Sequence, residues 1–233
     1  MNERRAQETT MQKFATTAPV SAVLDIPAGR IQLIAADRAD ATVEVRPANP
    51  SKSRDVRAAE QITVDFREGV LRVAAAPAKN RLLGNSGAVE VTVQLPAGSR
   101  VEAKAAAADL RGVGRLGDVV FDGAQAQVKL DETASARLTV QAGDVALGRV
   151  GGPAEVSTQK GDITIAEAVR GTVTLTTQHG DISVGAARGV SATLDAGTGY
   201  GRIGNALNNT DGPAAALTIR ATTSYGDINA RSI

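Results

Sequence analysis

A tripeptide that returns at nearly even intervals dominates the second half of the chain. Gly143-Asp144-Val145 is followed by Gly-Asp-Ile at 161–163, 180–182 and 226–228, and a degenerate Gly201-Arg202-Ile203 lies between the last two. The second residues of these tripeptides follow one another at intervals of 18, 19, 21 and 25 positions. Repeats of about 20 residues are typical of stacked coils that cannot bury their apolar faces alone. The repeat therefore predicts a solenoid over residues 101–233.

Each coil is expected to contain two short strands joined by two turns. Apolar residues alternate after the aspartate, as at Ile163 and Ile165, and also in the segment before the next aspartate, as at Val173 and Leu175. Alternation with a period of two is typical of half-buried β-strands. One turn carries Gly-Asp, and the other often carries Arg-Gly. The pattern predicts an all-β protein, a β-solenoid of two-strand coils of about 18–21 residues that stack in parallel.

The interior of these coils has to be thin and aliphatic. The chain of 233 residues has three Phe, two Tyr and no Trp, while Gly alone accounts for 24 residues. Aromatic side chains, which bury roughly 150–250 Å² each, can therefore contribute little to the core. Val, Ile, Leu and Ala are expected to fill the core.

Residues 12–100 show longer alternating runs. They predict an N-terminal antiparallel β region that caps the solenoid or forms one continuous domain with it. Pro-Ala-Gly turns at 27–29 and 96–98 end two of these runs and are interpreted as equivalent corners. Residues 49–60 have helical character and start from a turn with capping residues. Residues 1–11 are predicted to be a disordered tail, and the last coil, which stops at Ile233 without a cap, predicts an open end.

Composition excludes several function classes. The chain has 26 basic and 25 acidic side chains, and a net charge of +1 favours neither nucleic acid nor an anionic membrane as a partner. It has no cysteine, which excludes disulfides and thiolate metal sites. The N-terminus lacks the apolar segment of a signal peptide, and no apolar run approaches the roughly 20 residues of a membrane span. A cytoplasmic location is expected, with the cell surface by a non-standard route as the alternative.

The repeated aspartates are interpreted as structural turn residues. Glycine tolerates the positive φ of a tight corner, and an aspartate carboxylate accepts hydrogen bonds from backbone N–H groups two residues on. A ladder of carboxylates would also suit cations, but the calcium-binding Gly-Gly-x-Gly-x-Asp pattern is absent and Arg202 interrupts the row with the opposite charge. We predict no metal and no other cofactor. The structural turn residues are Asp118, Asp144, Asp162, Asp181 and Asp227.

The only histidine, His179, occupies a variable position of the repeat. Lys160, Tyr200 and Tyr225 hold this position in other coils. A position that accepts such different side chains is solvated surface rather than a catalytic or metal-binding site. Lys160, His179, Tyr200 and Tyr225 are a candidate surface row that faces a partner, because tyrosine suits interfaces.

Enzymatic signatures are missing. The chain has no nucleophile elbow, no phosphate-binding glycine loop before a helix and no HExxH motif. Its acids recur with the turn rather than converge at one place. The chain is predicted not to be an enzyme.

With these features the chain resembles a bacterial family labelled "putative adhesin", a domain of unknown function made of β-strand repeats. The resemblance covers nearly the whole chain and includes PVSAVLDIPAGR near the N-terminus, the DVRAAEQ helix and the closing RATTSYGDI. It implies a β-solenoid capped by N-terminal strands. The expected function is a non-enzymatic, adhesin-like module that binds a protein or glycan through the solenoid surface, without nucleic acid or membrane insertion. The alternative is an intracellular scaffold protein that self-associates through solenoid ends or faces.

Overall fold

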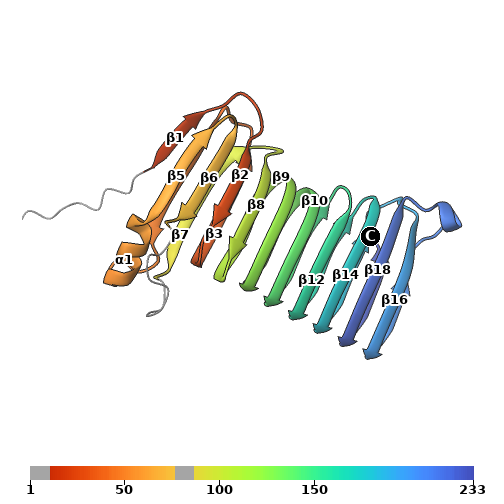
Figure 1. The fold of residues 1–233 in the computed structure, drawn as a ribbon. Helices are drawn as coiled ribbons and strands as arrows, with labels where there is room; N and C mark the ends of the chain where they lie inside the picture. Colours follow the sequence, from red (N-terminus) through yellow and green to blue (C-terminus); the bar gives the residue numbers. More distant parts are fainter. Residues whose placement is uncertain (1–10, 77–86) are drawn as a thin grey trace, which may run out of the picture.

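The computed structural model describes residues 11–76 and 87–233, and its elements are strands apart from one α-helix and one short 3₁₀ helix. Figure 1 shows the strands as slanted ribs of an elongated body. The predicted tail falls almost wholly on residues 1–10, outside the described residues. The elements are β1 Gln12–Ala15, β2 Ser21–Asp25, β3 Ala28–Ala36, β4 Asp40–Pro47, α1 Ser53–Glu60, β5 Ile62–Arg67, β6 Val70–Ala75, β7 Val89–Pro96, β8 Arg100–Ala105, β9 Ala107–Gln125, β10 Val128–Ala142, β11 Val145–Val150, β12 Ala154–Lys160, β13 Ile163–Ala168, β14 Gly171–His179, β15 Ile182–Ala186, β16 Ala192–Tyr200, β17 Ile203–Ala206, η1 Gly212–Ala214, β18 Leu217–Tyr225 and β19 Ile228–Ser232.

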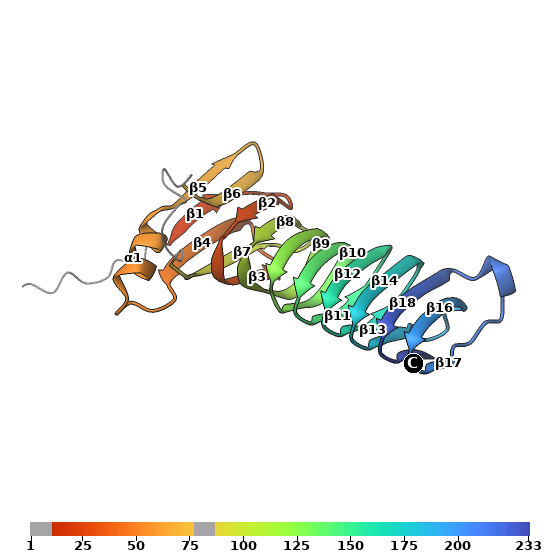
Figure 2. The ribbon, with the colours of Figure 1, turned by 60° about the horizontal axis from the view of Figure 1, so that its bottom comes forward.

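The strands form two facing layers that run along the body (Figure 2). Each coil contributes one strand to each layer, and successive coils pair in parallel, β12 with β14 in one layer and β13 with β15 in the other. The long strand β10 passes through both layers, because its first half pairs with β11 and its second half with β12. This is the parallel β-solenoid of two-strand coils that the sequence predicts.

The coils do not stack in chain order near the C-terminus. Strand β18 pairs with β14 on one side and with β16 on the other, and β19 lies in the same way between β15 and β17. Figure 1 shows β18 between β14 and β16. The prediction that the final coil forms an open end is therefore wrong. The connection over residues 207–216 is long enough for the chain to step back, so the outermost coil is β16–β17.

The N-terminal region combines parallel coils with an antiparallel cap. Strand β2 pairs in parallel with both β6 and β8, so strands on the two sides of residue 100 are direct neighbours. The antiparallel pairs are β1 with β4, β4 with β7, and β5 with β6. Phe14 of β1 and Phe66 of β5 meet with ring centroids 5.2 Å apart. These rings close the core at this end of the body.

Helix α1 is shorter than the helical segment read from the sequence. It begins at Ser53, and its N-cap residue Lys52 makes no side-chain capping bond. Asn49 instead stabilises the turn before the helix, where its Oδ1 accepts a hydrogen bond from the Ser51 N–H at 2.9 Å. The helix packs on β4 and β7.

The core is aliphatic, as composition predicts. Val173, Leu175, Ile219 and similar side chains are fully buried between the layers, and Phe121 is the one ring among the largest fully buried side chains of the described residues. Burying each such aliphatic side chain contributes roughly 1.5–3 kcal/mol. The two Pro-Ala-Gly turns are not equivalent corners. The turn at 27–29 crosses from the layer of β2 to that of β3, and the turn at 96–98 crosses back from β7 to β8.

Candidate functional site

One corner of the solenoid carries the Gly-Asp repeat, and glycine is required there by close approach of the coils. Gly161 has a φ of 145°, and a Cβ on it would lie 2.1 Å from the carbonyl oxygen of Gly143 in the preceding coil. The Gly161 N–H donates to the His179 carbonyl, and the Ile163 N–H donates to the Asp181 carbonyl, both in the next coil. The corner therefore joins coils through their backbones as tightly as the strands do.

Each aspartate of this corner accepts a hydrogen bond from the next coil rather than from its own turn. Its Oδ1 accepts the backbone N–H of the residue at the same position one coil further along the body. The expected bond to an N–H two residues on is therefore wrong, and the carboxylates link neighbouring coils. The N···O distances are 2.9 Å from Asp162 to Asp144, 2.8 Å from Asp181 to Asp162, 2.7 Å from Asp227 to Asp181 and 2.8 Å from Arg202 to Asp227.

Asp118 does not belong to this set. It lies between the half of β9 that pairs with β3 and the half that pairs with β8, at the opposite corner of the coil. Its Oδ1 accepts a hydrogen bond from Ser135 Oγ at 2.6 Å. The equivalent position is held by Asp109, whose Oδ1 accepts the Gln127 N–H at 3.0 Å. The prediction that Asp118 is equivalent to the other four aspartates is therefore wrong, because Gly-Asp occurs at both corners of the coil.

Threonines complete the corner from the inside. Thr177, Thr198 and Thr223 each donate a hydroxyl hydrogen bond to the carbonyl of a corner glycine in the preceding coil, at 2.9–3.1 Å. The sequence signal is the threonine three residues before the glycine. The hydroxyl of Thr158, in register with Thr177, is also buried but makes no hydrogen bond among the described residues. A buried unpaired hydroxyl costs about 1–3 kcal/mol, so the three bonded threonines hold the better-satisfied part of the corner.

Arg202 ends the acidic row, which consists of Asp144, Asp162, Asp181 and Asp227. The sequence predicts that Arg202 interrupts this row, but the stacking order puts it beyond Asp227 on the outermost coil. Its guanidinium lies 3.2 Å from Asp227 Oδ2. The pKa of Asp227 lies below its ordinary value, first because its carboxylate accepts the Arg202 backbone N–H and second because of the Arg202 side chain.

The candidate surface row lies on the outside of the same corner. Lys160 is in register with His179, His179 with Tyr225, and Tyr225 with Tyr200. The rings of His179 and Tyr225 stack at 5.0 Å and 7°, and those of Tyr225 and Tyr200 at 5.0 Å and 6°. We call these four residues the corner row. Its members were read from the sequence, whereas the spatial order, in which Tyr225 lies between His179 and Tyr200, was not.

Tyr200 and Tyr225 are among the most exposed large hydrophobic side chains of the described residues. Tyr200 is 70% exposed and Tyr225 is 51% exposed. The two rings are held on a rigid strand corner, so a partner that contacts them has little side-chain motion to freeze. The corner row is therefore the part of the described surface where ring contacts are most available.

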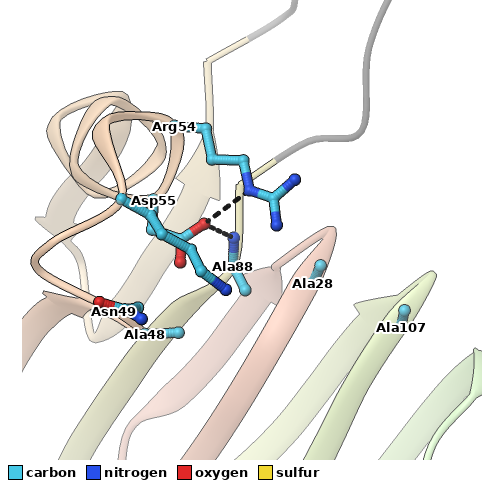
Figure 3. A pocket seen from close by; sticks show the side chains of 8 residues that line it. Ala28, Ala48, Asn49, Arg54, Asp55, Ala88 and Ala107 are labelled. Atoms are coloured by element: carbon cyan, nitrogen blue, oxygen red, sulfur yellow. Dashed lines mark hydrogen bonds and ion pairs between the residues drawn. The ribbon is translucent and has the colours of Figure 1, made fainter.

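A shallow pocket of about 590 Å³ lies at the other end of the same corner, beside α1 (Figure 3). The residues that line it include Ala28, Ala107, Lys52 and Arg54. The buried carboxylate of Asp55 accepts the Ala88 N–H at 3.1 Å, which fastens α1 to the start of β7. The sequence gives no signal for this pocket, because its walls come from four separate segments spread over residues 28–107.

Other kinds of site are not formed by the residues that the structure describes. Among them, no three His, Asp or Glu side chains come together as a metal site requires. In residues 11–76 and 87–233, neither helix has the length and apolar character needed to cross a lipid bilayer.

These features define a class of protein, a β-solenoid of two-strand coils with an antiparallel cap and a corner ladder of glycine, aspartate and threonine. Residues 23–232 match the family model described as Toastrack DUF4097. The chain belongs to this family.

Solved structures share similarity over nearly their whole length. A "putative cell adhesion protein" from Clostridium sporogenes is 12% identical with a TM-score of 0.41, and the match covers 96% of this chain and 99% of that one. A "putative adhesin" from Parabacteroides distasonis is 14% identical with a TM-score of 0.43, and covers 96% of each chain. A "putative lipid binding protein" from the same organism is 12% identical with a TM-score of 0.42, over 94% and 96%. No curated protein matches this chain.

Proposed function

We propose that the chain is a non-enzymatic binding module that holds a protein or glycan partner against the corner row, Lys160, His179, Tyr225 and Tyr200. The observation that carries this proposal is the column of three stacked, exposed rings on a rigid corner. Tyrosine rings supply large contact area at low entropic cost and are enriched at the centres of interfaces. Lys160 adds a cation at one end of the column.

The arrangement of acids supports binding rather than catalysis. Glycan-cleaving enzymes place two carboxyl groups about 5–10 Å apart across one bond of the substrate. Here each carboxylate of the acidic row is engaged by the backbone N–H of the next coil. These groups stabilise the scaffold and are not directed together into a cleft.

The alternative, a scaffold that self-associates through its ends, has one observation in its favour, the open coil β16–β17. Growth into filaments needs two open ends, and the antiparallel cap with Phe14 and Phe66 closes the other one. We therefore place the binding-module proposal first. The cytoplasmic location expected from the sequence stays a prediction.

The test is a binding screen of the full chain against a glycan array and a panel of purified surface proteins, followed by variants of Tyr225. Tyr225→Ala is expected to weaken binding to any hit by about tenfold or more, because it removes the central ring of the column. Tyr225→Phe keeps the ring and is expected to stay within about threefold.

Thr176→Ala, on the exposed face of β14, is the matched control away from the corner row. Thermal unfolding of each variant checks that the fold is kept. Equal affinities for wild type and Tyr225→Ala would contradict the proposal.

A further inference from the structure

The outermost coil, β16–β17, leaves its core edge uncovered. Ile203 is 46% exposed, although its equivalents Ile182 and Ile228 are fully buried. Leu194 and Ala196 of β16 are only partly buried, whereas the matching residues of inner coils are covered on both sides. No strand of the described residues lies beyond this coil, since β16 pairs with β18 and β17 with β19.

The backbone of β16 is ready to pair with one more strand. In a parallel ladder, alternate residues bond to opposite neighbours. The Leu217 N–H donates to the Ser191 carbonyl, so the backbone N–H and C=O groups of the odd-numbered residues of β16 point toward β18. The backbone groups of the even-numbered residues point away from β18, toward the open edge. The first of these residues, Ala192, already donates its N–H to the Asn208 carbonyl. Leu194, Ala196 and Thr198 therefore present donors and acceptors to the open side.

The side chains of the open edge show what a further strand would carry. The outer face of the Tyr200 ring continues a column with a spacing of 5.0 Å, so an aromatic residue fits in register with it. Thr198 lies in register with Thr223, which lies in register with Thr177, and each of these three donates to a glycine carbonyl of the preceding coil. An incoming threonine would find the Gly201 carbonyl in the same way.

Charge at the end of the acidic row favours an acidic residue in the incoming strand. The Arg202 side chain is 90% exposed, although it contacts Asp227. An arginine cannot accept the backbone N–H that each aspartate of the row accepts, so it ends the ladder. It presents its remaining donors to a carboxylate placed in register.

A second copy of the chain fits this end less well. Nine residues of β16 and a layer spacing of about 10 Å give a cross-section of roughly 300 Å² per copy. Stable interfaces bury about 800 Å² on each partner. A two-fold contact would also pair the β16 strands antiparallel, which leaves Tyr200 without a ring to stack on.

We infer that the open edge of β16 binds an extended segment of a partner protein as an added parallel strand. The segment carries two alternating apolar residues, a threonine, an aromatic residue in register with Tyr200 and an acidic residue in register with Arg202, each two positions apart. This inference rests on the proposed binding function and names the chemical class of the partner. Main-chain hydrogen bonds give the affinity, and the side-chain pockets give the selectivity.

The probe is a fluorescent peptide that copies residues 217–228, LTIRATTSYGDI, whose pattern meets these requirements. Its binding to the full chain is measured by fluorescence anisotropy at concentrations where light scattering shows that the peptide is monomeric. In the register of β18 on β14, the peptide's residue 222 directs its N–H toward the protein and residue 221 directs its N–H away. N-methylation at 222 is expected to weaken binding at least tenfold, and N-methylation at 221 by no more than about threefold.

Ala196 supplies the matched variants on the protein. Ala196→Pro removes one outward N–H, a change that edge strands tolerate, and is expected to weaken binding at least tenfold. Ala196→Val keeps that N–H and is expected to bind within about threefold of wild type. Thermal unfolding reports whether Ala196→Pro folds. The methylated peptides give the same test on the wild-type protein if it does not.

Each outcome decides the inference. Strand addition is supported if peptide binding is lost with the peptide methylated at 222 and with Ala196→Pro, and is kept with the peptide methylated at 221 and with Ala196→Val. Absence of peptide binding up to about 1 mM, or equal affinity of the two methylated peptides, overturns it. A dimer seen by light scattering that Ala196→Pro dissociates would overturn it in favour of a second copy. The Tyr225→Ala screen is read separately, so corner-row binding can survive the failure of strand addition.

Discussion

A corner glycine is the residue that the fold can least replace. Gly161→Ala would place a Cβ 2.1 Å from the Gly143 carbonyl oxygen at a φ of 145°. Backbone strain of roughly 1–2 kcal/mol adds to overpacking of roughly 1–3 kcal/mol. We expect the free energy of unfolding to fall by about 2–5 kcal/mol, measured by urea denaturation. Gly197→Ala is the control, because nothing lies within 4 Å of its Cβ position, and a comparable loss there would contradict the contact argument.

Asp227 makes the stability of the open end depend on pH. Its pKa is lowered in the folded protein, first by the bond from the Arg202 N–H and then by the Arg202 side chain. A carboxyl group with a lowered folded pKa stabilises the fold above its unfolded pKa, and that contribution disappears as pH falls through the folded value.

Asp227→Asn keeps the Oδ1 acceptor and removes the titration. We expect the wild type to exceed the variant in melting temperature at pH 6, and the difference to shrink below about pH 4, where unfolded aspartates bind protons. Thermal scans between pH 6 and pH 2.5 measure this. A difference that stays constant with pH would show that the charge of Asp227 plays no part.

The elements themselves were largely readable from the sequence, but their neighbours were not. Alternation of apolar residues and the Gly-Asp corner follow from chemistry within one coil, so the strands and the aliphatic core could be predicted. Stacking order depends on which coil covers which. Thr198 of β16 and Thr223 of β18 occupy the same position of the corner, so either coil could supply the hydroxyl that bonds the Gly180 carbonyl of the preceding coil. The sequence pattern within each coil therefore fits chain order and the observed order equally well. Only the long connection over residues 207–216 indicates that the last two coils exchange places.

The candidate site shows the same limit. The members of the corner row share one position of the repeat, so the sequence pattern alone predicts which residues belong to it. The contact of His179 with Tyr225 rather than with Tyr200 depends on the exchange of coils. The Asp118 error has a related cause, because a Gly-Asp dipeptide does not reveal which of the two corners it occupies. The open edge of β16 likewise appears only when the coils are placed in space.

At the scale of the whole molecule, stability depends on how many neighbours each coil has. In stacked repeats it is approximately a sum of coil terms and contacts between adjacent coils. The coil β18–β19 has neighbours on both sides, although it ends the chain, whereas β16–β17 has a neighbour on one side. A coil opens locally more often when it has fewer neighbouring coils, whatever its distance from the end of the chain. The coil β16–β17 is therefore expected to open more often than the coil β18–β19.

Hydrogen exchange tests this reversal directly. We expect peptides from residues 192–206 to exchange about tenfold faster than peptides from residues 217–232, because the outermost coil opens without disturbing the coil beneath it. Peptides from β12 and β14, which are internal in any order, serve as the slow reference. Adding the strand peptide should slow exchange at β16 if it covers that edge. Faster exchange at β18–β19 than at β16–β17 would mean that the coils stack in chain order, and the edge available to a partner would then belong to the final coil.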